Sequence, residues 1–191
     1  MGEHCNCGHE HHHHDDAKHL ESMYEQALSL YDFNIKDEDV KEAVKKIIAE
    51  KVPENDTPEV KKFMFGSIEL TTLTTQDSAE SVLKLVEKVN DFAHEYPDMP
   101  HVATIVTYPR FAKLVAESCE VEGVIPTVVS GAFPSSQALL EIKVAETALA
   151  IKDGAKNVDI VMHVGEFLAG DYETVCDELR RNWTSHNLMA V

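Results

Sequence analysis

The hydrophobic positions of residues 37–52 recur at helical spacing and predict an amphipathic helix. The apolar residues of this stripe are Val40, Ala43, Val44, Ile47 and Ile48. Asp37 is the expected N-cap, and Pro53 is expected to end the helix. Residues 57–59 (Thr-Pro-Glu) then combine an N-cap, a proline at the first helical position and an acidic first turn. This combination predicts a second, short helix.

From residue 65 onward, short apolar runs alternate with amphipathic segments. The pattern predicts strands at 65–70, 102–107, 126–130 and 157–164, with helices at 78–93, 109–118, 136–153 and 172–181. Gly154 is expected to stop the third of these helices. Alternation at this spacing is typical of parallel βα units, so we expect an α/β fold with four such units.

The composition limits the classes of function. The chain has 191 residues, of which 43% are hydrophobic and 27% charged, as in a globular protein with one core. It has no apolar run of 18 residues, and its polar start does not resemble a signal peptide, so we expect a cytoplasmic protein with no membrane association. The net charge of −17 argues against a nucleic-acid partner but allows a small phosphorylated substrate. Four scattered cysteines suit a reducing compartment.

Residues 1–19 form a head that holds seven of the 11 histidines and has little apolar content, so we expect it to be disordered. Weak candidates for metal ligands in this head are His4, Cys5, Cys7 and His9. Their spacing does not resemble a folded zinc site. Two interpretations stay open: specific metal binding, and a solvated tail that binds metals only adventitiously. Deleting the head would abolish the first function and leave the rest of the chain unchanged.

Asp159 lies inside an otherwise apolar predicted strand, where a carboxylate is costly unless it is paired or functional. His163 would share its strand face, at the carboxyl end where barrel active sites gather. Glu69 is a second acidic residue in an apolar strand, followed by hydroxyl residues. Each residue has a structural alternative. Asp159 would be a buried aspartate whose hydrogen bonds are satisfied, His163 would be structural, and Glu69 would belong to a strand cap followed by a polar turn.

Two strand-to-helix junctions carry further polar residues. Arg110 follows a Tyr-Pro pair, where it would meet either an anion or solvent. Ser135 and Ser136 follow Phe133-Pro134 and are expected first of all as helix caps.

Five segments appear in a characteristic order: IELTTL, YPRF, GAFPSSQ, KVAETALAIKDGA and NVDIVMHVGEFLAGDYETV. Together they resemble the N-terminal half of deoxyribose-phosphate aldolase, over about residues 58–180. The resemblance implies the first half of a TIM barrel, preceded here by a helical extension. It also implies a class I lyase without a cofactor, which cleaves 2-deoxyribose 5-phosphate to glyceraldehyde 3-phosphate and acetaldehyde through a lysine Schiff base.

The resemblance assigns roles to individual positions. Asp159 matches the family's proton-relay aspartate, and Glu69 stands where the family has an aspartate in the first strand. Val106 stands where the family has a cysteine in the second strand. The family's Lys-Thr-Ser-Thr-Gly motif with the Schiff-base lysine does not occur in this chain, nor does its second lysine before a Gly-Gly pair. Other lysines fall on predicted helices or their ends: Lys113, Lys143, Lys152 and Lys156.

These features predict four segments: a disordered head (1–19), a helical extension (20–64), an aldolase-like (β/α)4 half barrel (65–180) and an unrelated tail (181–191). The change of pattern near residue 180 suggests a truncation or a frameshift. We expect the chain by itself to lack aldolase activity, and its open sheet to pair with a complementing half barrel or to oligomerise. The alternative is a non-catalytic remnant that acts as an assembly module, or as a metal-binding module through the histidine-rich head.

Overall fold

The computed structural model describes residues 29–31 and 34–184. The chain divides into two compact units, Met1–Lys51 and Val52–Val191. Helix α2 (Asp37–Asn55) begins in the first unit and ends in the second, and none of its residues is buried. The expectation that Pro53 ends this helix is wrong, because α2 continues to Asn55. A proline so close to a helix end removes only one backbone hydrogen bond.

Helix α3 (Pro58–Gly66) confirms the predicted short helix. Its N-cap is Thr57, whose hydroxyl accepts a hydrogen bond from the amide of Val60 at 3.2 Å. The helix extends further than the sequence suggested, so strand β1 (Glu69–Thr71) starts later than residue 65.

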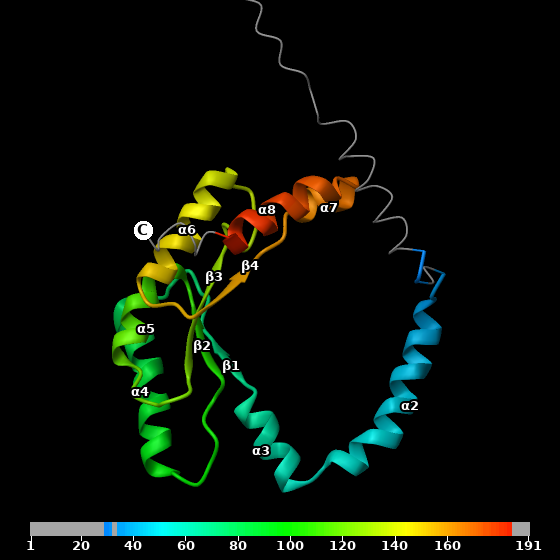
Figure 1. The fold of residues 1–191 in the computed structure, drawn as a ribbon. Coiled ribbons are helices and arrows are strands. Elements are labelled where there is room, and N and C mark those ends of the chain that lie inside the picture. Colours follow the sequence, from blue (N-terminus) through cyan, green and yellow to red (C-terminus); the bar gives the residue numbers. More distant parts are fainter. Residues whose placement is uncertain (1–28, 32–33, 185–191) are drawn as a thin grey trace, which may run out of the picture. The chain divides into compact units, whose positions relative to one another are not determined.

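The second unit contains a four-stranded parallel sheet in the order β1-β2-β3-β4, which confirms the α/β fold (Figure 1). The other strands are β2 (Thr104–Thr107), β3 (Ile125–Ser130) and β4 (Asn157–Ile160). The helices that follow the strands are α4 (Ala79–Glu95), the 3-10 turn η1 (Pro109–Phe111) with α5 (Ala112–Ser118), α6 (Leu140–Lys152), and α7 (Val164–Ala169) with α8 (Tyr172–Thr184). No helix in the described ranges is long and apolar enough to cross a lipid bilayer.

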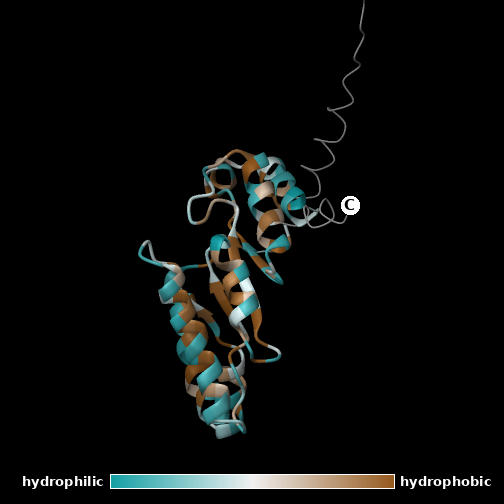
Figure 2. Cartoon of the chain, turned by 90° about the vertical axis from the view of Figure 1, so that its left-hand side faces the viewer, coloured by the Kyte–Doolittle hydropathy of each residue, from teal (hydrophilic) through white to brown (hydrophobic). Residues whose placement is uncertain are grey.

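The core lies between one face of the sheet and helices α4 to α6. The predicted apolar stripe of α4 is confirmed, since Val82, Val86 and Val89 pack with Ile105 of β2. A second cluster joins α5, β3 and α6 at Ala112, Val128 and Ala150. Figure 2 shows mostly hydrophobic strands and helices that carry both polar and apolar sides. Because side chains alternate along a strand, the strand residues that lie between those of the core point to the opposite face of the sheet.

The third βα unit differs locally from the predicted pattern. Helix α6 starts at Leu140 rather than at residue 136, and its N-cap residue, Leu139, makes no side-chain cap. Ser136 has a positive φ of 58° and is fully buried, so it does not cap α6 as expected. The stop at Gly154 is confirmed: its φ is 106°, and an added Cβ would lie 2.7 Å from that of Ala116.

Candidate active site at the carboxyl ends of the strands

An open pocket of about 330 Å³ lies over the face of the sheet that the helices leave uncovered, toward the carboxyl ends of the strands. Its lining residues come from all four strands and the segments that follow them: Thr71, Leu73, Val106, Val129, Phe133, Asp159, Ile160 and Val161. In parallel α/β folds, this end of the sheet is where ligands bind. The pocket is therefore the site on which the candidate residues are judged.

Asp159 lies on the edge strand β4, where it pairs with Val129 of β3, and its side chain lines the pocket. Of the described residues that line this pocket, Asp159 alone is ionisable. The alternative of a buried aspartate is wrong, because Asp159 is an exposed residue. The geometry thus presents a single carboxylate to an otherwise mostly apolar cavity.

The other two family-matched positions separate in the structure. Val106 pairs with Thr71 and lines the pocket together with Asp159. Glu69 pairs with Thr104, two residues closer to the amino end of β1, and is not among the lining residues. The structure therefore brings Asp159 and Val106 into one cavity and leaves Glu69 below it.

His163 does not share a strand face with Asp159, because β4 ends at Ile160. Instead, His163 is the N-cap of α7, and its Nδ1 accepts a hydrogen bond from the amide of Glu166 at 3.3 Å. An accepting Nδ1 leaves the ring proton on Nε2. The structural alternative for this histidine is thus the correct one.

Arg110 is exposed, and its guanidinium carbon lies 4.9 Å from the ring centroid of Phe111. This contact is a cation–π interaction with the adjacent residue. Arg110 is not among the residues that line the pocket.

The loop after β1 is held by Asp77, whose carboxylate accepts hydrogen bonds from the Thr72 hydroxyl at 2.8 Å and from the amide and hydroxyl of Thr74 at 3.0 and 2.8 Å. Burial raises the pKa of Asp77, but the bonds from Thr72 and Thr74 together outweigh burial and hold the pKa below its usual value of 3.8. The hydroxyl of Tyr108 also donates to the carbonyl of Leu73 at 3.1 Å. These bonds fix the segment that forms the β1 side of the pocket.

A buried ionic group behind the site was not anticipated. Lys143 of α6 is only 1% exposed, and its Nζ donates to Glu178 of α8 and to Ser136. The helical pattern predicts Lys143 on a helix, which is correct, but does not indicate that its side chain is buried. The available signal was its position four residues before Thr147, which is also buried, on one face of α6.

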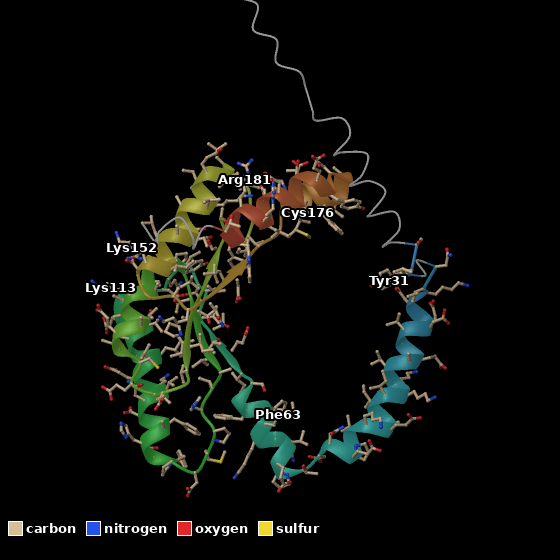
Figure 3. The ribbon with its side chains drawn as sticks, in the orientation of Figure 1. Tyr31, Phe63, Lys113, Lys152, Cys176 and Arg181 are labelled. Atoms are coloured by element: carbon tan, nitrogen blue, oxygen red, sulfur yellow. The ribbon has the colours of Figure 1, made fainter. Side chains whose placement is uncertain are left out.

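None of the lysines within residues 29–31 and 34–184 lines the pocket at the carboxyl ends of the strands, but Lys156 and Asp159 both line a second pocket, of about 590 Å³, beside α6 and α8. Lys113 and Lys152 lie on the outer side of the helical layer (Figure 3). Within the same ranges, no three His, Cys, Asp or Glu side chains come together in a way that would hold a metal ion. The metal-ligand candidates of the head, His4, Cys5, Cys7 and His9, lie outside the described residues.

Known proteins resemble the chain in sequence and in fold. No protein-family model matches it. A Caenorhabditis elegans relative named for deoxyribose-phosphate aldolase is 31% identical over 158 residues, which cover 81% of this chain and 46% of the relative. A deoxyribose-phosphate aldolase of Clostridium botulinum (strain ATCC 19397 / Type A) is 32% identical over 114 residues, which cover 60% of this chain and 50% of that enzyme.

The chain belongs to the deoxyribose-phosphate aldolase family. It spans about half the length of the curated relatives it matches. A solved structure from Coccidioides immitis, also named for deoxyribose-phosphate aldolase, shares the fold with a TM-score of 0.58 at 21% identity, over 81% of this chain and 59% of that one. The four parallel βα units are therefore part of the deoxyribose-phosphate aldolase TIM barrel.

Proposed function

We propose that this chain supplies the acid-bearing wall of an aldolase active site that acts on 2-deoxyribose 5-phosphate. The observation that carries the proposal is the position of Asp159, which is the only ionisable residue among those lining the pocket. Family membership adds the substrate class and the reaction type, a retro-aldol cleavage through a Schiff base.

Asp159 would act as the group that moves protons during the cleavage. A Schiff base is a cationic electron sink, and forming or hydrolysing it requires proton transfer to and from oxygen and nitrogen. A carboxylate within reach of the reacting carbon serves as general acid and base in such steps. Once complementing strands cover the open pocket, its mostly apolar lining, which includes Val106 and Val129, would limit access of water to the intermediate.

The covalent lysine would come from outside these four units. The family's Lys-Thr-Ser-Thr-Gly motif does not occur in the 191 residues, and no described lysine lines the pocket at the carboxyl ends of the strands; Lys156 lines only the second pocket, beside α6 and α8. We therefore expect the chain to need a complementing set of strands, in the same polypeptide or in a partner, before it can form a Schiff base. Strands β1 and β4, at the two ends of the sheet order, are the positions where such strands would add.

Borohydride trapping tests the covalent part of the proposal. The 191-residue chain is incubated with 2-deoxyribose 5-phosphate and sodium borohydride, and its intact mass is measured. We expect no adduct. A reduced adduct on any lysine of this chain would overturn the proposal that the Schiff-base lysine lies elsewhere. The Lys143→Met variant serves as a control that removes the one lysine found fully buried among residues 29–31 and 34–184.

A further inference from the structure

We propose that Lys143, acting through Ser136, is a positioning residue that holds the end of β4 and thereby orients Asp159. The inference rests on the proposed function, in which Asp159 is the proton-transfer group. Nothing in the family resemblance assigns a role to Lys143 or to its partners. Three consecutive contacts lead from the helical layer to the rim of the pocket.

The first contact is a buried ion pair between two helices. The Nζ atom of Lys143 in α6 lies 2.8 Å from Oε2 and 3.1 Å from Oε1 of Glu178 in α8. The side chains of Lys143 and Glu178 are 1% and 11% exposed. An ammonium group so far from water needs partners for all three of its protons. Glu178 accepts two of the hydrogen bonds, so the third donor direction decides where else the group acts.

The second contact is with Ser136, whose Oγ lies 2.9 Å from Nζ of Lys143 and which is fully buried. A lysine ammonium group can only donate, so the hydroxyl oxygen of Ser136 must accept. The hydroxyl proton of Ser136 is then left to donate to a different acceptor. The ion pair thus fixes the direction of the next hydrogen bond.

The third contact is that donation, from Oγ of Ser136 to the carbonyl oxygen of Val161 at 3.3 Å. The amide of Val161 donates to the carbonyl of Ser130 in β3 at 3.2 Å. Val161 is therefore held on both sides directly after β4 ends. Val161 lines the same pocket as Asp159, which lies two residues earlier in the chain. Loss of the Ser136 bond would leave only the sheet side of this attachment.

A neighbouring group of contacts, centred on Glu146, holds the start of the loop between β3 and α6, the loop that also contains Ser136. Oε2 of Glu146, one turn along α6 from Lys143, accepts from the amide of Ala132 at 3.0 Å and from the hydroxyl of Ser130 at 3.2 Å. These bonds involve neither Lys143 nor Ser136, and they reach Val161 only through Ser130, whose carbonyl accepts from the Val161 amide. Removing Lys143 or Ser136 should therefore loosen the end of β4 without releasing the end of β3.

Hydrogen exchange of the full chain, measured residue by residue by NMR, tests the proposal. Ser136→Ala should raise the exchange rate of the Val161 amide by about tenfold or more, the effect of losing one buried hydrogen bond. The Lys143→Met/Glu178→Leu double variant should raise it by a similar factor. The triple variant should raise it no further, because the residues act in series. Amides of β2 report global unfolding and should keep their rates once corrected for stability.

A second readout concerns the pocket itself. The side-chain carboxyl ¹³C resonance of Asp159 should move in Ser136→Ala and in the double variant. It should stay in place in the controls Ser135→Ala and Lys113→Met, which alter an adjacent serine and an exposed lysine. A merely structural ion pair would lower stability without moving this resonance.

The proposal is overturned if Val161 exchanges no faster in Ser136→Ala than in Ser135→Ala, or if the effects multiply in the triple variant. Should the ion-pair variants fail to fold, Ser136→Ala decides by itself, since it removes one oxygen atom. Asp159→Asn should leave the exchange of Val161 as it is in the unaltered chain. If the proposed aldolase function failed its own test, the exchange result for Val161 would still stand. If the exchange result failed, the proposed aldolase function would be unaffected.

Discussion

Asp159 of β4 pairs with Val129 of β3, and both residues line the pocket over the uncovered face of the sheet. The pairing places a carboxylate on an edge strand beside a buried apolar residue. The side chain of Asp159 is exposed, so the fold does not depend on it for packing. We propose that this carboxylate, which lines a pocket of mostly apolar residues, serves proton transfer rather than packing.

Breaking the buried ion pair between Lys143 and Glu178 from one side should lower the free energy of unfolding much more than replacing both partners. Lys143→Met should lower the free energy of unfolding by about 3–5 kcal/mol, because Glu178 is left as a buried charge without its counter-ion. Lys143→Met/Glu178→Leu should recover much of this loss, because no uncompensated charge remains. Lys113→Met, at an exposed site with an i,i+4 partner in Glu117, should change the value by less than about 0.5 kcal/mol. Urea unfolding of the four proteins measures these differences.

Two buried threonines should respond in opposite directions to replacement by valine. In the described part of the chain, the hydroxyl of Thr107 is buried without a hydrogen-bond partner, so Thr107→Val should raise the free energy of unfolding by about 1 kcal/mol. The hydroxyl of Thr147 lies 2.7 Å from that of Ser130 and 3.3 Å from Oδ1 of Asn182. Thr147→Val should therefore cost about 1–3 kcal/mol. Thermal or urea unfolding would contradict this account if both variants moved the same way.

The carboxylate of Asp77 should titrate at a lower pH than an unperturbed aspartate. Hydrogen bonds from Thr72 and Thr74 hold its pKa below 3.8 in the folded state, although burial acts in the opposite direction. The pKa of Asp77 is lower in the folded state than in the unfolded state, where it is about 4. The ionised carboxylate therefore stabilises the fold fully at pH values above that unfolded-state pKa. That contribution is lost as the pH falls through the folded-state pKa.

An NMR titration of the Asp77 carboxyl carbon measures this midpoint directly. Thr72→Val/Thr74→Val removes the two hydroxyl donors and keeps the backbone donor of Thr74. The midpoint should rise in this variant toward that of an unperturbed aspartate. An unchanged midpoint would mean that the hydroxyl groups do not set the pKa of Asp77.

Much of the compact unit Val52–Val191 could be predicted from the sequence, because its helices and strands are short and strongly patterned. The stripe of Val82, Val86 and Val89 fixes both the type and the buried face of α4. Thr57 with Pro58 marks the start of α3 by capping chemistry that is local to the chain. At these positions a local signal was enough, whereas the local signals at Pro53 and Ser136 led to wrong predictions.

The differences arise where the structure depends on contacts between distant segments. The apolar run after Asp159 fits both a strand and the start of a helix, so periodicity did not reveal that β4 ends at Ile160 and that His163 caps α7. The burial of Lys143 depends on Glu178, which is 35 residues away in the sequence. Lysine is rarely buried, so composition favoured the opposite expectation. The family resemblance placed Asp159, Glu69 and Val106 in one active-site wall, and only the structure shows that Glu69 does not line the pocket.

The central claim is that Asp159 is the proton-transfer group of an aldolase site to which this chain lends one wall. A chimera, in which the matched 114 residues replace their counterpart in the Clostridium botulinum relative, would carry that relative's remaining half. The rate of 2-deoxyribose 5-phosphate cleavage by this chimera is the most direct test. We expect turnover, with a kcat that falls by about 10²- to 10⁴-fold in Asp159→Asn while the melting temperature stays the same. A folded chimera without turnover, or one whose kcat is unchanged by Asp159→Asn, would contradict the claim.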